Sequence, residues 1–168
     1  RENNIKIKTT SEASRKYDIN MDFFRSINEN SMYWMGFILA DGSFQKSTRS
    51  TYQLVIGLAI KDINHLKKFR RLIQPEIAIT EIKPKETDCF KNNGSCRISI
   101  SSTEICEDIW KFGITPNKSK EVILSDEVKF NKHFWRGFVD GDGYLGYIES
   151  GNNKHRLEVV GNTSTLNY

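Results

Sequence analysis

The apolar positions of this chain alternate in some stretches and recur every three to four residues in others, which predicts strands and helices. Residues 53–61 alternate, with apolar side chains on one face and small or polar ones on the other, as in a half-buried strand. The pattern predicts, in order, helix 31–41 between Ser31 and Gly42, strand 44–47, strand 53–61, a helix opened by Asp62, strands 77–83 and 95–100, and a helix opened by Ser102. This order is α-β-β-α-β-β-α.

A nine-residue segment of the chain occurs twice. Residues 34–42 read WMGFILADG and residues 135–143 read WRGFVDGDG, so the second copy begins 101 residues later (135 − 34 = 101). The repeat predicts an N-terminal extension (1–30), a first unit (31–113), a linker (114–130) and the start of a second unit (131–168). By this offset we expect the second unit to be incomplete in this chain, with its remainder truncated or present as a separate chain.

Small residues form a stripe on each repeated helix. Gly36 and Ala40 lie four residues apart, as do Gly137 and Gly141, so each pair shares one helix face. A stripe without large side chains lets another helix approach closely, and we therefore expect the two helices to pack against each other.

Asp41 and Asp142 follow these stripes directly, so close packing of the helices would bring two carboxylates together. Two adjacent carboxylates favour either a shared proton or a divalent cation between them. Their oxygen ligands suit Mg²⁺, or a similar ion such as Mn²⁺, which can activate water for phosphodiester hydrolysis.

Two other interpretations of the motif stay open. An Asp-Gly pair is also an ordinary end of a helix. Asp140, Asp142 and Gly143 match positions 3, 5 and 6 of a calcium-binding EF-hand loop, but Phe138 at position 1 offers no oxygen. Strand-like sequence also follows where an EF-hand needs a helix.

The net charge of +4, from 25 basic and 21 acidic residues, permits nucleic-acid binding without requiring it. The cysteines, Cys89, Cys96 and Cys106, are odd in number and lack metal-ligand spacing, which predicts reduced thiols. No apolar run is long enough for a membrane span, and no signal peptide is visible. We expect a protein of the cytoplasm, of a bacterium or a phage-infected cell, or of an organelle, that is not secreted.

At residues 34–42 and 135–143 the chain resembles the LAGLIDADG homing endonucleases of the single-chain, two-motif type. The resemblance implies an α+β fold: a pseudo-twofold repeat of α-β-β-α-β-β-α units with antiparallel sheets that face DNA. It also implies a metal-dependent endonuclease that cuts both strands of a long double-stranded DNA target, and its gene could lie in an intron, lie in an intein or be free-standing. Leu39 departs from the family's first acid, which the second motif keeps as Asp140.

The resemblance further implies the site residues. The last acid of each motif would bind the metal, together with the main-chain carbonyls of Ala40 and Gly141. Lys118, in a segment after the third helix, would lie near the scissile phosphates, although it can also be a solvated linker lysine. Residues expected to contact DNA are Ser43, Gln45, Lys46, Arg49, Gln53, Lys61, Arg97 and Lys120.

Residues 1–30 and the activity itself leave alternatives. Residues 11–17 are expected to form a helix, and Phe23, Phe24 and Ile27 to pack onto the first unit. An intron RNA maturase or a non-catalytic DNA-binding protein could use the same fold. Retention of both acids argues against a degenerate binder but not against a bifunctional maturase.

Overall fold

The protein is described from a computed structural model, which covers residues 18–47, 51–84, 93–116, 118, 122–148 and 154–161. It is an α+β protein with antiparallel sheets, which confirms the predicted class. The first part of the chain contains α2 (Glu29–Asp41), β1 (Gly42–Lys46), β2 (Tyr52–Ala59), η1 (Ile60–Asp62), α3 (Ile63–Ile73), β3 (Ile79–Ile82), β4 (Ser95–Ser101) and α4 (Thr103–Trp110). The later part contains α5 (Asp126–Lys129), α6 (Lys132–Asp142), β5 (Gly143–Ile148) and β6 (Lys154–Val159).

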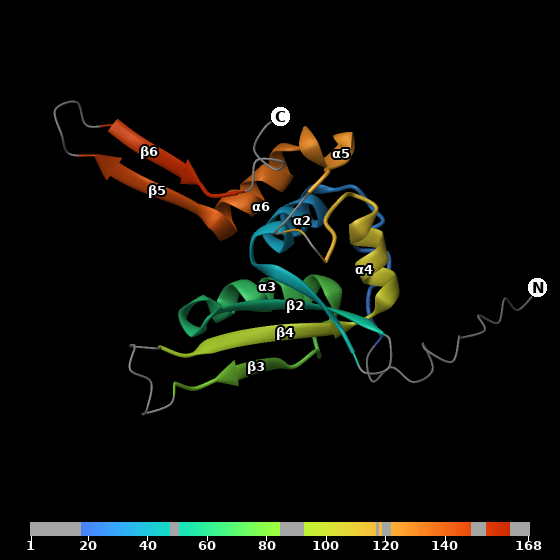
Figure 1. Ribbon diagram of the computed structural model, residues 1–168. Coiled ribbons are helices and arrows are strands. Elements are labelled where there is room, and N and C mark those ends of the chain that lie inside the picture. Colours follow the sequence, from blue (N-terminus) through green and yellow to red (C-terminus); the bar gives the residue numbers. More distant parts are fainter. Residues whose placement is uncertain are drawn as a thin grey trace, which may run out of the picture.

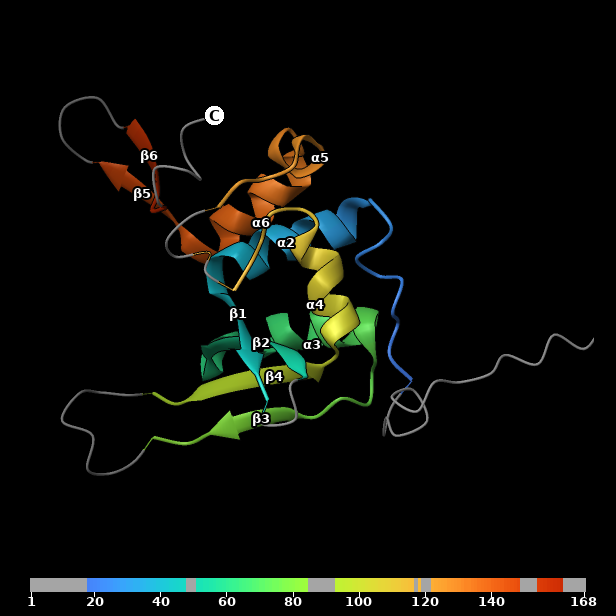
Figure 2. The same cartoon turned by 45° about the vertical axis from the view of Figure 1, so that its right-hand side comes forward.

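The first four strands form one antiparallel sheet in the order β1-β2-β4-β3. Figures 1 and 2 show α2, α3 and α4 on one side of this sheet and, within the part of the chain that the structure describes, no helix on the other. Alternation along the strands explains this arrangement. Phe44, Leu54 and Ile100 are partners across three strands and point toward the helices, whereas Gln45 and Gln53 point to the open side.

Helix α2 begins two residues earlier than the sequence pattern predicts. Its N-cap is Asn28, whose side chain accepts hydrogen bonds from the backbone of Asn30 (3.0 Å) and Ser31 (3.1 Å). The Ser31 hydroxyl accepts from the Asn28 amide at 3.0 Å and closes a capping box. The prediction of Ser31 as the N-cap was wrong because a serine three residues into a helix can bond back to its cap.

One further local prediction needed correction. Residues 60 and 61, expected to end the second strand, form the short helix η1, so β2 ends at Ala59. The interval 114–130 contains the short helix α5, whose Val128 is fully buried. The cap at Ser102 agrees with the sequence, since its hydroxyl accepts from the Ile105 amide, and Asn131 caps α6 by accepting from the His133 amide.

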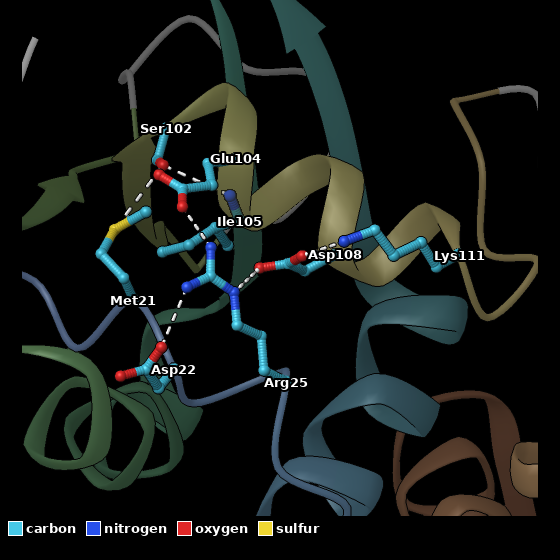
Figure 3. A network of polar contacts seen from close by, with 8 residues as sticks. All are labelled: Met21, Asp22, Arg25, Ser102, Glu104, Ile105, Asp108 and Lys111. Atoms are coloured by element: carbon cyan, nitrogen blue, oxygen red, sulfur yellow. Dashed lines mark hydrogen bonds and ion pairs between the residues drawn. The ribbon is translucent and has the colours of Figure 1, made fainter.

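The segment before α2 is fixed to the first unit by aromatic packing and by ion pairs. Phe23 and Phe24 are buried and pack on Phe69 of α3, as expected, whereas Ile27 is 51% exposed and does not join them. In Figure 3 the Arg25 guanidinium reaches α4, where its Nε donates to Asp108 at 2.8 Å.

This ion pair belongs to a larger network around the same guanidinium. Arg25 also pairs with Glu104 and with Asp22, and Lys111 pairs with Asp108 at 2.6 Å (Figure 3). The buried carboxylate of Asp108 thus has two cationic partners. Buried charges are tolerated when they are paired in this way. The predicted helix at residues 11–17 lies outside the described residues.

The second repeat contributes α6 and the two-stranded ribbon β5–β6, which projects away from the larger sheet (Figure 1). The two parts share one hydrophobic core, because Phe134 and Phe138 of α6 are buried in the same cluster as Met35 and Phe37 of α2. Among the helices that the structure describes, none is both long enough and apolar enough to cross a membrane.

Candidate active site at the crossing of the two motif helices

Helices α2 and α6 pack against each other at Gly36 and Gly137, the residues predicted at their interface. A Cβ atom added to Gly36 would lie 1.8 Å from the Phe134 carbonyl oxygen, and one added to Gly137 would lie 1.9 Å from that of Tyr33. Real side chains do not come that close to a backbone atom, so only glycine permits this approach. The contacts are reciprocal, as expected for helices related by a pseudo-twofold axis.

The ends of both helices meet at one point. Gly141 lies against α2, since a Cβ added to it would be 2.4 Å from the Ala40 Cβ and 3.2 Å from the Asp41 Oδ2. Gly42 and Gly143 end the helices with extended φ values of −77° and −86°. The left-handed conformation expected of a helix-ending glycine is therefore not used. Glycine is needed there for space, because an added Cβ would meet the helix's own Ile38 or Val139.

Asp41, Asp142 and Lys118 come together at this point. The Lys118 ammonium donates hydrogen bonds to the main-chain carbonyl oxygens of Leu39 and Ala40, the latter at 2.9 Å. Asp41 is half-buried and Asp142 is exposed. One lysine from the interval after α4 thus lies beside both motif acids, although 78 residues separate it from Ala40.

The electrostatics of these groups show how strongly they interact. Burial raises the pKa of Asp41, and the nearby charge of Asp142 raises it further, while Lys118 acts in the opposite direction. Burial also lowers the pKa of Lys118, against the effect of the two carboxylates. An acid that is reluctant to ionise beside a second acid is stabilised by added positive charge.

A divalent cation fits this donor set on chemical grounds. The described residues contain no group of three or more His, Cys, Asp or Glu side chains arranged to hold a metal. Mg²⁺ needs fewer protein ligands, because it is commonly bound through one or two carboxylates with its other positions filled by water and substrate phosphates. Asp41 and Asp142 are the carboxylates that could hold it, whereas the Ala40 carbonyl, also expected as a ligand, accepts a hydrogen bond from Lys118.

A groove of about 570 Å³ connects Asp41 with the open side of the sheet. Its lining includes Ser43 of β1, Gly57 and Ala59 of β2, and Arg97 of β4. Ser43 pairs with Val55, Gln45 with Gln53, and Gly57 with Arg97, so these residues all lie on the face without helices. Ser43, Gln45, Gln53 and Arg97 therefore share one face of the sheet, and Ser43 and Arg97 line the groove that also contains Asp41.

The remaining residues expected to contact DNA are placed differently. Lys46 lies on the other face at the end of β1, where its ammonium is 5.9 Å from the centre of the Tyr52 ring. Lys61 is exposed in η1, beyond the end of β2. Arg49 and Lys120 lie outside the described residues.

A second cavity, of about 350 Å³, contains residues to which the sequence interpretation gave no role. Asp62, His65 and Asp140 line it together with Asp41 and Gly141. Asp62 was interpreted only as a helix cap, yet its side chain makes no capping hydrogen bond. The available signal was Asp140 itself, an acid in the second motif at the place of Leu39 in the first.

The described elements therefore define an α+β protein in which two packed helices bring a pair of acids to the edge of an open antiparallel sheet. The sequence matches no protein-family profile and no curated protein. Among solved structures, the chain is similar to LAGLIDADG homing endonucleases. One is "I-SmaMI bound to uncleaved DNA target in the presence of Calcium ions", with a TM-score of 0.43 and 16% identity over 79% of this chain and 66% of that one.

Two more similar structures belong to the same group. "LAGLIDADG Meganuclease I-AabMI Bound to Uncleaved DNA" has a TM-score of 0.46 and 14% identity over 78% of this chain and 65% of that one. "LAGLIDADG homing endonuclease I-GzeII in complex with DNA target" has a TM-score of 0.43 and 15% identity over 79% and 65%. The chain thus spans just under two thirds of the length of these proteins.

Proposed function

We propose that this protein is a LAGLIDADG-type homing endonuclease that hydrolyses phosphodiester bonds in both strands of a long DNA target with a divalent cation. The observation that carries the proposal is the meeting of Asp41, Asp142 and Lys118 beside the open polar sheet face. Each of the three comes from a different part of the chain. A structural role alone does not require two acids at a helix crossing, because their proximity is unfavourable for both.

In this proposal each residue has a defined task. Asp41 and Asp142 hold the cation, which supplies activation of water and stabilisation of the leaving oxygen. The Lys118 ammonium offsets charge that develops on the phosphate. Ser43, Gln45, Gln53 and Arg97 contact base edges and phosphates, because a β-ribbon can enter the major groove.

The proposed partners are double-stranded DNA and further polypeptide that completes the second unit. The second partner is motivated by the ribbon β5–β6, whose Leu145 and Leu157 are paired with each other and exposed. A complete second unit would add phosphate contacts, so it would steepen the dependence of DNA affinity on salt by about 0.9 per phosphate neutralised.

Plasmid cleavage tests the proposal. The full-length protein and its Asp41→Asn and Asp142→Asn variants are incubated with Mg²⁺ and a supercoiled plasmid that carries the uninterrupted host locus. Each variant should lose at least about 100-fold in cleavage rate, the scale of removing one charge-stabilising group. DNA binding should remain, since the amide keeps the shape of the carboxylate.

The control is Asp126→Asn, which removes an exposed acid of α5 that lines neither cavity beside the acid pair. It should cut at the wild-type rate. Linear rather than nicked product shows cleavage of both strands. Cleavage at the wild-type rate by either Asp41→Asn or Asp142→Asn would show that the acid pair is not the catalytic centre.

A further inference from the structure

The hydroxyl of Tyr33, on α2, joins three helices on one side of the crossing. It donates a hydrogen bond to Asp140 Oδ2 of α6 at 2.7 Å and lies 3.1 Å from His65 Nε2 of α3. Because the hydroxyl has one proton, and that proton goes to Asp140, His65 must be the donor at the other contact. The Tyr33 pKa is raised by burial and by the Asp140 carboxylate, so the phenol keeps the proton that it donates.

The side chains around Tyr33 hold its ring in place. The Arg136 guanidinium lies 4.9 Å from the ring centre, and Arg136 also pairs with Glu29 at 3.1 Å. The His65 ring packs against those of Trp34 and Phe37, with centre-to-centre distances of 4.7 and 4.6 Å. The position of the hydroxyl is therefore set by rigid aromatic neighbours rather than by a flexible chain.

The other side of the crossing has no such polar contact, although the motifs are equivalent. At the repeat offset, Tyr33 corresponds to Phe134, and Asp140 corresponds to Leu39. Phe134 and Leu39 are both buried in the core. The end of α2 is thus held by apolar packing and by the Lys118 hydrogen bonds to the Leu39 and Ala40 carbonyls, whereas Asp140 near the end of α6 is exposed and the ribbon that follows it is uncovered.

We propose that Tyr33 is a positioning residue that fixes the last turn of α6, from which Asp142 projects, by binding Asp140 while His65 holds the hydroxyl. The importance of this contact for cleavage rests on the proposed function. Asp140 lies two residues before Asp142 in the same helix turn, so an α6 end that frays would lose the direction of the Asp142 carboxylate. A misplacement of a reacting group by about 1 Å can cost 100-fold in rate.

Amide hydrogen exchange tests the contact without reference to activity. The Gly143 amide donates to the Val139 carbonyl at the end of α6, and the Gly42 amide donates to Ile38 at the equivalent place in α2. Tyr33→Phe should raise the exchange rate of Gly143 about two- to tenfold, the range for loss of one ordinary hydrogen bond, and leave Gly42 unchanged.

Two variants separate the contact from general destabilisation. Asp140→Leu, which introduces the residue that the first motif has at this position, should raise Gly143 exchange by a similar factor. Tyr33→Phe in the same protein should then cause no further increase in that exchange rate. Tyr52→Phe, whose ring packs on Trp110 in the first unit, is the matched control and should change neither amide. The proposal is overturned if Gly143 exchange stays at the wild-type rate in Tyr33→Phe, or if Gly42 exchange rises equally.

Binding of Mn²⁺, followed by its electron paramagnetic resonance signal, links the contact to the acid pair. Tyr33→Phe should weaken Mn²⁺ binding about two- to tenfold while Asp41 and Asp142 remain in place. Asp140→Asn in the protein that keeps Tyr33 should retain most of the wild-type affinity, because the amide oxygen still accepts from the Tyr33 hydroxyl. An unchanged Mn²⁺ affinity in Tyr33→Phe would overturn the role at the metal site. A wild-type protein that binds no Mn²⁺ and cuts no DNA would refute the proposed function, whereas the exchange of Gly143 decides the contact separately.

Discussion

The two repeated segments build the same local structure but end in different surroundings. Each forms a helix that begins at an asparagine N-cap. The helix crosses its partner at a glycine and is followed by a strand that starts at a second glycine. After that point they diverge. Phe44 of β1 packs 5.7 Å from Trp110 of α4, and its strand partner Leu54 is 1% exposed. At the corresponding place in the ribbon β5–β6, Leu145 is 74% and Leu157 is 58% exposed.

This difference shows that the local structure of a motif and the burial of its strands have separate causes. The turn from helix to strand depends on residues next to one another, so both copies form it. Burial of the strands depends on α3 and α4, which follow the first copy in sequence and cover its sheet (Figure 1). Most of the stability of such an element comes from tertiary packing rather than from local preference.

The largest effect is expected at the crossing that both copies share. Gly36→Ala and Gly137→Ala should each destabilise the protein by more than about 3 kcal/mol, the upper end for overpacking, because the new Cβ would collide with a backbone carbonyl. Thermal unfolding monitored by circular dichroism measures the loss. The two variants should be equally harmful, since the contact is reciprocal.

Gly57→Ala is the control for the glycine variants. Its added Cβ would meet nothing closer than the Cys96 carbonyl at 4.0 Å, so stability should change by less than about 1 kcal/mol. If Gly137→Ala proved as mild as Gly57→Ala, α6 would not be packed on α2 as described, and the second copy would be independent of the first.

A smaller effect should distinguish the two hairpins. Leu54→Ala should cost about 2–5 kcal/mol, because it removes a fully buried side chain. Leu157→Ala, at the equivalent place in β6, should cost less than about 0.5 kcal/mol in the same chain. Urea unfolding gives both values. A large cost for Leu157→Ala would mean that this leucine is covered in solution, and the contrast between the units would disappear.

The smallest effect concerns pH and reports on the first unit, where all three cysteines occur. Burial raises the pKa of Cys106 from an ordinary 9.0 to about 12. Between these values the unfolded thiol ionises while the native one stays neutral. Stability should therefore fall as pH rises above 9, by at most about 1.4 kcal/mol per pH unit. Below pH 9 this contribution is constant.

Comparison of the wild type with Cys106→Ala at pH 8 and pH 10 isolates this thiol. The alanine variant should lose less stability than the wild type over this interval. A thiol reagent should also label Cys106 only after unfolding, because the side chain is buried in α4. Rapid labelling of the native protein would show that α4 opens readily. The first unit would then be less firmly packed than the burial of its side chains indicates.

Much of this architecture follows from sequence alone, and the reasons are local. Alternation of apolar residues identifies β2 and β4 because side chains on a strand point to opposite faces in turn. Ser102 was recognisable as a cap because a short polar side chain can bond only to nearby amides. The choice of Ser31 failed for the same reason, since Asn28 and Ser31 both fulfil that condition.

The candidate site also has features that the sequence predicts and contacts that only the structure shows. Repetition of the motif indicates that Asp41 and Asp142 are equivalent, and the glycine stripes indicate that their helices approach. No sequence spacing brings His65 of α3 and Asp140 of α6 to one tyrosine. Such contacts depend on how helices and strands far apart in the chain are oriented, and only the packing of the complete core fixes those orientations. The sequence by itself thus determined the pair of acids and the open polar face, while tertiary structure alone decided which neighbours surround them.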